Sequence, residues 1–337
     1  MNQMQTRTIP LLEVIPETVE NKHFYTNGLS KLIPHLTLKV HSDLEKCYVL
    51  WDKFSPKQTL FDLWDFRYSF YEGYKCTPFF YTLYEGKKVL GVLPLWYDEY
   101  ENKYQWFGGW YHEENRFFVE DEKLIDFLLA VSPAPLKLNS IKQFEKIKKL
   151  EMFGALGKDS DLKYFKNIEN VSSMDGFLKR LKKKRRYHIK TDYKRLVKQG
   201  VRIEKSGNED SHLLELMISM NKQRFDGVVR DIYPNERDQN SFRRVVRNAE
   251  IYDVSFLQAK ARNKIAAIDI VISYKDVYYQ FAGANDVENF NGIGHYMAYY
   301  EIEDAINQGF KFIDCFQEDH SWKHRYFDSR EVFEFEK

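Results

Sequence analysis

The chain has 337 residues, of which 43% are hydrophobic and 16% aromatic, and its 51 Lys and Arg nearly balance 50 Asp and Glu. This length exceeds one typical hydrophobic core and predicts two domains, and the composition excludes a disordered or collagen-like chain. No segment approaches the roughly 18 apolar residues of a membrane span, and the first residues lack the pattern of a secretory signal.

The first half of the chain predicts helices followed by an antiparallel hairpin. Apolar residues at helical spacing indicate helices over 42–53 and 58–71. The turn 85–88, with the sequence Glu-Gly-Lys-Lys, joins two strands that are rich in aromatic and β-branched residues. The remaining elements expected here are a strand near 103–108, a helix over 122–130, a break followed by a strand within 131–138, and an amphipathic helix over 141–153.

The second half repeats this order, which predicts a mixed α/β fold, with an α+β mixed sheet, made of two related domains. We place the domains at residues 1–160 and 161–337. The elements expected in the second are a strand over 162–171, a helix over 173–199 that ends before Gly200, helices over 211–225 and 241–248, strands over 252–261, 265–274 and 276–283, a helix over 295–308 and a strand over 310–316.

Positive charge is concentrated in one segment, residues 179–198, which holds eleven Lys and Arg and one Asp. Its charge is +10, so the rest of the chain sums to −9, because the whole chain carries +1. Such a segment predicts an anionic partner: cofactor phosphates, RNA or an acidic surface. Arg185 falls in the apolar stripe of this helix, where a guanidinium has to snorkel, pair with an acid or meet a specific anion.

The cysteines and histidines indicate neither disulfides nor a metal. Cys47, Cys76 and Cys315 have no CxxC spacing, and the histidines show no ligand spacing on one predicted element. We therefore expect no metal site and a protein of the reducing cytoplasm.

A glycine-containing loop joins the last long strand to a helix that begins at His295. Its sequence is Asn289-Phe290-Asn291-Gly292-Ile293-Gly294. Two glycines one residue apart let the backbone pass close to a bulky anion, and the first N–H groups of the helix point at it. The loop therefore predicts a phosphate or pyrophosphate site; the alternative is an ordinary strand-to-helix turn.

Asp269 stands within an apolar strand, IAAIDIVIS. Alternation puts its carboxyl on one face with Ala267 and Val271, where partial desolvation raises its pKa toward the range of a general base. Asp269 is thus our candidate base, and Gln280 on the adjoining strand is a candidate substrate or oxyanion contact. The alternative is a structural Asp paired with a neighbouring Arg.

Together these motifs resemble the FemAB-like branch of the GNAT-fold acyltransferases. In that family the loop Gln/Arg-x-x-Gly-x-Gly/Ala holds the CoA pyrophosphate; Gly292 and Gly294 match both glycines, and Asn289 stands where the family has Gln or Arg. The segment 172–201 resembles the basic helix that opens the second domain. The segment 309–326 resembles the closing strand and turn.

The resemblance implies two tandem GNAT-like domains, the first degenerate, and transfer of an acyl group from acyl-CoA to an amine. It implies donor contacts at Asn289, Gly292, Ile293, Gly294, His295 and Lys323. It implies substrate contacts at Arg185, Arg186, Arg224, Asp231 and Asp314, and adds Tyr233 to the catalytic candidates Asp269 and Gln280. Two alternatives stay open: an aminoacyl-tRNA donor whose acceptor stem lies on the basic helix, and a binding module without enzymatic activity.

Overall fold

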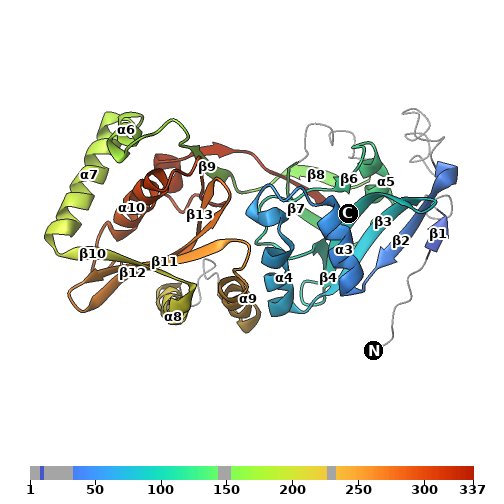
Figure 1. Cartoon of the computed structure of the whole chain (residues 1–337), viewed down its shortest axis with the longest axis horizontal. Helices are drawn as coiled ribbons and strands as arrows, with labels where there is room; N and C mark the ends of the chain where they lie inside the picture. Colours follow the sequence, from blue (N-terminus) through green and yellow to red (C-terminus); the bar gives the residue numbers. More distant parts are fainter. Residues whose placement is uncertain (1–7, 11–32, 143–152, 226–232) are drawn as a thin grey trace. The chain divides into compact units, whose positions relative to one another are not determined.

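The computed structural model describes residues 8–10, 33–142, 153–225 and 233–337, which fall into two compact units (Figure 1). Unit 1 lies within residues 1–71, 75–160 and 331–337, and unit 2 within 72–74 and 161–330. Most of the helix expected over 141–153 lies outside the described residues. Among the described helices, none combines the length and the apolar character needed to pass through a bilayer.

Unit 1 contains a six-stranded sheet in the order β1-β2-β3-β4-β5, with β6 beside β4, and a three-stranded sheet in the order β7-β16-β8. Its helices are α3 (Leu44–Phe54), α4 (Trp64–Tyr74) and α5 (Leu124–Ala130). Its strands are β1 (Thr8–Pro10), β2 (Leu36–His41), β3 (Thr77–Glu85), β4 (Lys88–Asp98), β5 (Lys103–Trp106), β6 (Phe118–Val119), β7 (Lys137–Ile141), β8 (Ala155–Lys158) and β16 (Phe333–Glu336).

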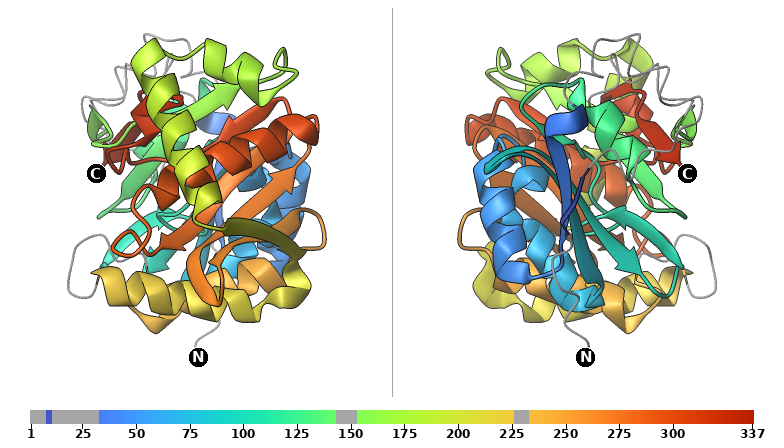
Figure 2. Two further views of the ribbon diagram at one scale, coloured as in Figure 1. Left: turned by 90° about the vertical axis from the view of Figure 1, so that its left-hand side faces the viewer. Right: turned by 90° about the vertical axis from the view of Figure 1, so that its right-hand side faces the viewer.

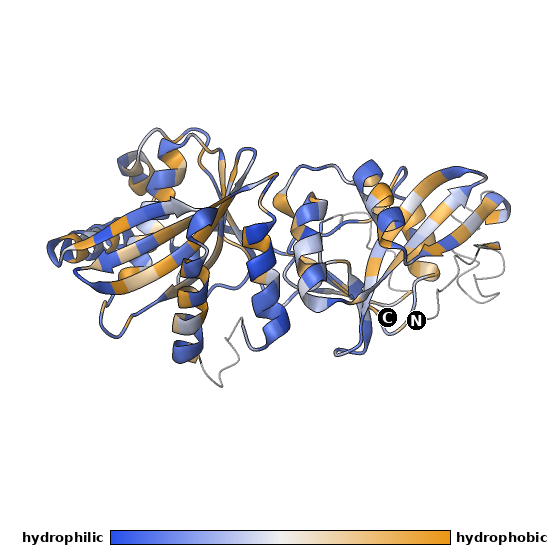
Figure 3. Cartoon of the chain, turned by 60° about the horizontal axis from the view of Figure 1, so that its bottom comes forward, coloured by the Kyte–Doolittle hydropathy of each residue, from blue (hydrophilic) through white to orange (hydrophobic). Residues whose placement is uncertain are grey.

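The expected hairpin is confirmed, because Glu85 pairs with Lys88 across the two-residue turn that starts at Gly86. Helices cover both faces of the larger sheet. On one face, Trp51 of α3 packs edge-on against Phe118 with ring centroids 4.8 Å apart. On the other, the buried side chains of α5 join the sheet in one hydrophobic cluster, and each such side chain contributes roughly 1.5–3 kcal/mol. Figure 3 shows the hydrophobic residues as orange bands along the strands.

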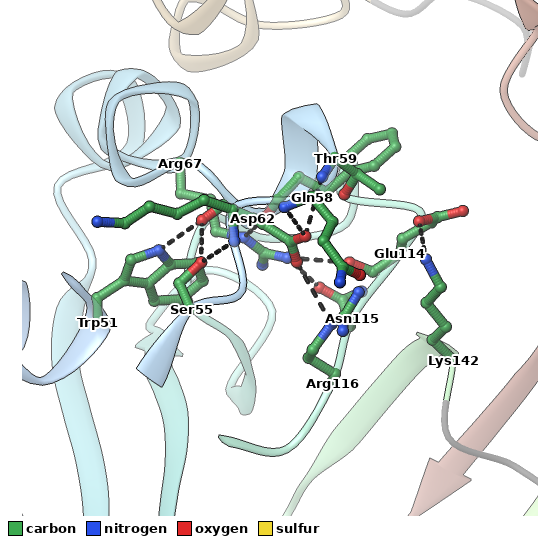
Figure 4. A network of polar contacts seen from close by, with 12 residues as sticks. Trp51, Ser55, Gln58, Thr59, Asp62, Arg67, Glu114, Asn115, Arg116 and Lys142 are labelled. Atoms are coloured by element: carbon green, nitrogen blue, oxygen red, sulfur yellow. Dashed lines mark hydrogen bonds and ion pairs between the residues drawn. The ribbon is translucent and has the colours of Figure 1, made fainter. Parts of the chain in front are cut away.

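A buried polar network crosses unit 1 around Arg67, whose side chain is 3% exposed (Figure 4). The guanidinium donates to Phe61 O (2.7 Å), Phe107 O (2.8 Å) and Asn115 Oδ1 (2.7 Å). Burial lowers the pKa of Arg67 to about 9. An unpaired buried cation is very costly, so the guanidinium has to keep these acceptors. The three segments that carry them are thereby held together around Arg67.

The last strand, β16, belongs to unit 1. It lies between β7 and β8 and pairs antiparallel with both. Residues 331–337 accordingly belong to unit 1, whereas the sequence analysis grouped them with residues 161–330. The place of β16 is decided by its pairing with strands that are distant in the sequence. The short pattern Phe-Glu-Phe-Glu does not predict which strands these are.

Unit 2 has a seven-stranded sheet in the order β10-β11-β12-β13-β14-β9-β15. Its helices are α6 (Met174–Lys179), α7 (Lys183–Lys198), α8 (His212–Phe225), α9 (Glu236–Arg247) and α10 (Ile293–Asn307), and a 3-10 turn, η6, spans Lys323–Arg325. Its strands are β9 (Lys163–Asn167), β10 (Val201–Gly207), β11 (Asp253–Ala261), β12 (Lys264–Tyr274), β13 (Val277–Asn285), β14 (Phe312–Asp314) and β15 (Asp328–Arg330).

The helices of unit 2 lie on opposite faces of its sheet. Helices α6, α7 and α10 cover one face, and α8 and α9 cover the other (Figure 1). Helices α7 and α10 cross beside each other over the sheet (Figure 2, left). Side chains of β12 with odd numbers from Ala267 to Val271 therefore face α10, and the even-numbered Ile268 and Ile270 face the opposite side.

Two helix predictions for unit 2 were wrong in their bounds. The single helix expected over 173–199 is divided, because Lys182 has an extended backbone (ψ 142°) between α6 and α7. This turn lets Phe177 and Leu178 reach the core, where both are fully buried. Helix α9 begins before the expected residue 241, because Asn235 caps it by accepting a bond from Asp238 N (3.0 Å).

Candidate functional site

Strands β13 and β14 run in parallel and separate soon after they begin. Their last paired residues are Tyr279 and Asp314, where β14 ends, while β13 continues to Asn285. Within the described residues, the main chain of 280–285 therefore has no neighbouring strand on the β14 side. Helix α10 starts a few residues further on and leads back to β14.

The glycine turn before α10 has one glycine that the fold requires and one that it does not. Gly292 precedes α10 with φ +79°, and a Cβ there would lie 2.9 Å from Arg195 Nη2. At Gly294 the backbone is not left-handed, and a Cβ would meet only Asn285 Nδ2, at 3.7 Å. Asn291 is exposed and both glycines keep part of their surface accessible, so the turn reaches solvent.

Two main-chain donors at this helix start are available to a ligand. Among the described residues, no group accepts a hydrogen bond from the N–H of Gly294 or His295. The N–H of Ile293, in contrast, already donates to Phe290 O (3.0 Å). The amide of Asn289 donates to Asp286 Oδ2 (2.7 Å), so its side chain fixes the turn. Of the expected donor contacts, Gly294 and His295 therefore offer free main-chain groups.

Helix α7 supports this turn from the side. Arg195 donates to Asn291 O (2.5 Å) and pairs with Asp192 (3.1 Å). One turn of α10 further on, Tyr296 stacks on Tyr193 of α7 with ring centroids 5.2 Å apart. The glycine turn is thus held in place by an ion-paired arginine and by aromatic packing.

The side chain of His295 connects α10 to the segment around η6. Its Nε2 lies 3.1 Å from Arg325 Nη1 and its Nδ1 lies 2.8 Å from Tyr326 Oη. A guanidinium only donates, so Nε2 accepts and Nδ1 carries the proton that binds the tyrosine oxygen. Burial, together with Arg325, lowers the pKa of His295, which keeps this imidazole neutral.

A pair of carboxyl groups lies between the sheet and α10. Asp269 of β12 is hydrogen-bonded to Glu301 of α10, and its carboxyl covers Gly283, where a Cβ would lie 2.1 Å from Asp269 Oδ1. Glu301 is 4% exposed, whereas Asp269 keeps part of its surface accessible. Burial raises the pKa of Asp269 to about 7 and that of Glu301 well above its usual range. Among the described residues, no arginine forms an ion pair with Asp269. Its neighbour is instead a second acid, Glu301.

Gln280 links this pair to the point where the strands separate. Its Nε2 donates to Glu301 Oε2 (2.5 Å), and its Oε1 accepts from Cys315 Sγ (2.7 Å). Gln280 and Cys315 directly follow the last paired residues of β13 and β14. The candidates Asp269 and Gln280 are therefore brought together through Glu301.

Asp314 and Lys323 both have partners within the protein. Asp314 is 8% exposed, and its Oδ1 lies 2.6 Å from Nζ of the fully buried Lys163. Lys323 is 6% exposed and donates to Gln317 O (2.5 Å). These contacts give both residues a structural role in closing the segment after β14.

The two arginines at the start of α7 differ. Arg185 donates to His324 O (2.9 Å) and Arg325 O (3.3 Å), which explains a cation in the apolar stripe of the helix. Arg186 is half-buried, and within the described part of the chain its guanidinium makes no hydrogen bond or ion pair. Arg186 is thus the one that remains available to an anion.

The expected substrate contacts Arg224 and Asp231 and the catalytic candidate Tyr233 do not lie in this cluster as far as the structure describes them. Arg224 is exposed at the end of α8, and it donates to Asn285 Oδ1 (2.5 Å) at the end of β13. Tyr233 is 0% exposed, and its ring packs on Phe242 at 4.8 Å, which places it in the core. Asp231 lies outside the described residues.

Glu301 is the residue that the sequence analysis missed. Met297, Ala298, Ile302 and Ala305 precede and follow it at spacings of one to four residues, and all four are buried. An acid in that apolar stripe is the signal that could have identified it.

Within the described part of the chain, no metal cluster marks this site. Among the described residues, no group of three or more His, Cys, Asp and Glu could hold a metal ion. A cavity of about 410 Å³ lies at the other end of α10, where Lys205, Ser255 and Gln308 contribute to its lining. Its lining contains none of the residues expected to bind the donor.

The chain is similar in fold to three solved structures. The structure of FemX covers 88% of this chain and 97% of its own, with a TM-score of 0.56 and 11% identity. L-PGS from Bacillus licheniformis covers 88% and 92%, with a TM-score of 0.54 and 10% identity. A tandem GNAT protein from the clavulanic acid biosynthesis pathway covers 89% and 98%, with a TM-score of 0.51 and 8% identity.

The chain is therefore a two-domain α/β protein of the GNAT fold. Residues 183–324 match the family Acetyltransf_6, which is described as an acetyltransferase (GNAT) domain. No curated protein sequence matches the chain. The matched segment runs from α7 through η6 and contains the separating strands, the glycine turn and the carboxyl pair.

Proposed function

We propose that the chain transfers an acyl group from acyl-CoA to an amine, with the donor bound in unit 2. One observation carries this proposal: a solvent-accessible glycine turn with free N–H groups lies at the start of α10, beside strands that separate at Gln280. Free donors at the N-terminus of a 15-residue helix favour the diphosphate of CoA. The main chain of 280–285, on the side where β14 no longer pairs with it, would then receive the acyl carbonyl.

The proposed reaction needs a proton acceptor and no covalent enzyme intermediate. The ammonium of the acceptor gives one proton to the Asp269 carboxylate and becomes a free amine. Its nitrogen then forms the new C–N bond as the C–S bond breaks, and the leaving thiolate takes the second nitrogen proton. Asp269 finally returns its proton to solvent, which its partly accessible carboxyl supports.

The proposed cellular setting is the cytoplasm. The three cysteines of the chain, all within the described residues, are buried and form no disulfide, which favours a reducing compartment. The acceptor is a small-molecule or peptide amine, and Arg186 and Arg224 are the described side chains that we propose for contacts to it.

Calorimetric titration of the full chain with CoA tests the donor site. Gly294→Asp adds a carboxylate beside the free N–H groups at a position where a Cβ fits, so CoA affinity should fall at least about tenfold while the fold is retained. Gly157→Asp in unit 1, where a Cβ meets nothing closer than 4.0 Å, makes the same change elsewhere and should leave affinity unchanged. Equal CoA affinity in both variants would remove the glycine turn from the mechanism.

An aminoacyl-tRNA donor is the second candidate, and the charge of α7 favours it. Of the eleven Lys and Arg in 179–198, only Lys190 and Arg195 pair with acids among the described residues. Five consecutive cations, 182–186, stand at the start of α7. A tRNA on this helix should show binding that weakens steeply with salt and is lost in Lys183→Glu/Lys184→Glu. If the chain binds neither CoA nor tRNA, a non-enzymatic binding module is supported instead.

A further inference from the structure

Glu301 lies where an ionised carboxylate is costly. It projects from α10 toward the sheet, is 4% exposed, and is surrounded by the hydrophobic cluster that joins α10 to β12 and β13. Within the described residues, no Lys, Arg or His forms an ion pair with it or with Asp269. Two adjacent acids without a cation must share a proton, because two ionised carboxylates offer only acceptors to each other.

Burial indicates which acid carries that proton, because Glu301 is 4% exposed whereas Asp269 keeps part of its surface accessible, so the charge is less costly on Asp269. Cys315 donates to Gln280 Oε1, which turns the Gln280 amide nitrogen toward Glu301. Glu301 Oε2 therefore accepts, so a proton on this carboxyl stands on the other oxygen, from which it can be donated to Asp269. A neutral Glu301 then donates to an Asp269 carboxylate.

We propose that Glu301 is a positioning residue, a carboxylic acid held neutral by burial that donates a hydrogen bond to Asp269 and so fixes and tunes the proton acceptor of the transfer. This inference rests on the proposed function, since it assigns Glu301 a part in the same site. The acid acts through Asp269, and Gln280 fixes it from the side where the strands separate. A hydrogen bond to the charged form of Asp269 favours that form and opposes the effect of burial.

The direction of the pKa changes agrees with this arrangement. Burial and the neighbouring Asp269 raise the pKa of Glu301 well above its usual range, whereas the hydrogen bond from Glu301 lowers the pKa of Asp269. The other titratable groups that face the pair are Tyr278 on β13, Asp304 on α10 and Cys315 after β14. Burial raises the pKa values of Tyr278 and Cys315 well above their ordinary values, which already lie above neutral pH. Neither side chain therefore changes charge near neutral pH. Asp304 is paired with Lys205 (2.8 Å), and Lys163 and Lys323 act on the far side of Cys315.

Two substitutions at residue 301 distinguish this role from simple packing. Glu301→Gln reproduces the protonated acid, because the amide nitrogen can donate to Asp269 while the amide oxygen accepts from Gln280. Glu301→Leu introduces an apolar side chain of similar size and removes the hydrogen-bond donor to Asp269. Glu303→Gln and Glu303→Leu make the same changes at a half-buried site on the same helix and serve as controls.

The first measurement is independent of activity. Carbon-13 NMR of the full chain, labelled at the aspartate carboxyls, follows the titration of Asp269, whose signal is assigned by its loss in Asp269→Asn. The midpoint should lie near neutral pH in the unsubstituted chain and in Glu301→Gln, and should rise by about one pH unit or more in Glu301→Leu. Equal midpoints in the Gln and Leu variants, or a midpoint near the ordinary aspartate value in the unsubstituted chain, would overturn the inference.

The second measurement is the release of CoA thiol from acetyl-CoA with a panel of primary amines. Glu301→Gln should keep the pH profile, and Glu301→Leu should shift its acid limb upward and lower turnover at pH 7 about tenfold, with CoA affinity unchanged. If the titrations behave as expected but the unsubstituted chain releases no thiol, the proposed function fails and the pair is a purely structural device. If turnover is present and both variants lose it equally, the positioning role is refuted while the transferase proposal stands.

Discussion

Replacing Asp269 with Asn should stabilise unit 2 at alkaline pH, although it removes the charge of the candidate base. In the native chain the Asp269 carboxyl is hydrogen-bonded to Glu301 and covers Gly283. Asparagine has nearly the same shape, and its side-chain oxygen can accept the same bond from Glu301. The substitution therefore removes mainly the ionisation of residue 269.

The expected size follows from the pKa of Asp269, which burial raises from 3.8 to about 7. A carboxyl with a raised pKa binds its proton more tightly in the folded state, so stability is lost as pH rises from about 4 to 7. A difference of this size corresponds to about 4 kcal/mol. Because part of the Asp269 surface remains accessible, solvent screening reduces this figure, and ~2 kcal/mol is the effect to look for.

Urea unfolding at pH 5 and pH 8, followed by hydrogen exchange of peptides from β12 and α10, measures the stability of unit 2. Because about two of the three pH units of the shift lie above pH 5, Asp269→Asn should gain about 1–1.5 kcal/mol relative to the unsubstituted chain between these two pH values. Asp276→Asn, at an exposed turn where Asp276 pairs with Lys311 (2.9 Å), is the matched control and should show little pH dependence. A loss of stability at Asp269→Asn that is equal at both pH values would refute the raised pKa.

Three further substitutions test contacts elsewhere. Arg67→Met should lower the free energy of unfolding of unit 1 by about 3–5 kcal/mol in urea titrations, because three carbonyl acceptors lose their buried donor; a cost under about 1 kcal/mol contradicts this. Gly292→Ala should cost more than the roughly 1 kcal/mol expected for Gly309→Ala, because both glycines are left-handed but only Gly292 has close neighbours; equal thermal unfolding midpoints would exclude the contact. Lys163→Met should cost about 3–5 kcal/mol at pH 7, and adding Asp314→Leu should recover part of it, whereas no recovery in denaturant titrations would show that the ion pair is not the cause.

Local patterns predicted the elements that build the site. The alternation around Asp269 placed it on the buried face of a strand, and the two glycines marked the start of the helix now seen as α10. Both features depend on neighbouring residues in the chain, which periodicity and turn chemistry describe well. Gln280 on the adjoining strand followed from the hairpin that joins β12 to β13.

Contacts between distant residues were not accessible in the same way. The expected partner of Asp269 was an arginine, and the structure supplies Glu301, whose helix returns over the strand 32 residues later. Arg185 was recognised as unusual in an apolar stripe, but its acceptors are main-chain carbonyls of η6, which no side-chain pattern reveals. Lys163 and Asp314 form an ion pair across the neighbouring strands β9 and β14, which lie near opposite ends of the sequence of unit 2.

The position of β16 has a consequence for how unit 1 is made. Its central strand in the β7-β16-β8 sheet is synthesised after all of unit 2, so the ribosome releases β7 and β8 long before the strand that joins them exists. Until then both strands present open edges, which are sites of mispairing. A fragment cut at residue 160 would keep those edges permanently, so an expression vector meant to yield unit 1 alone should append residues 331–337 through a linker.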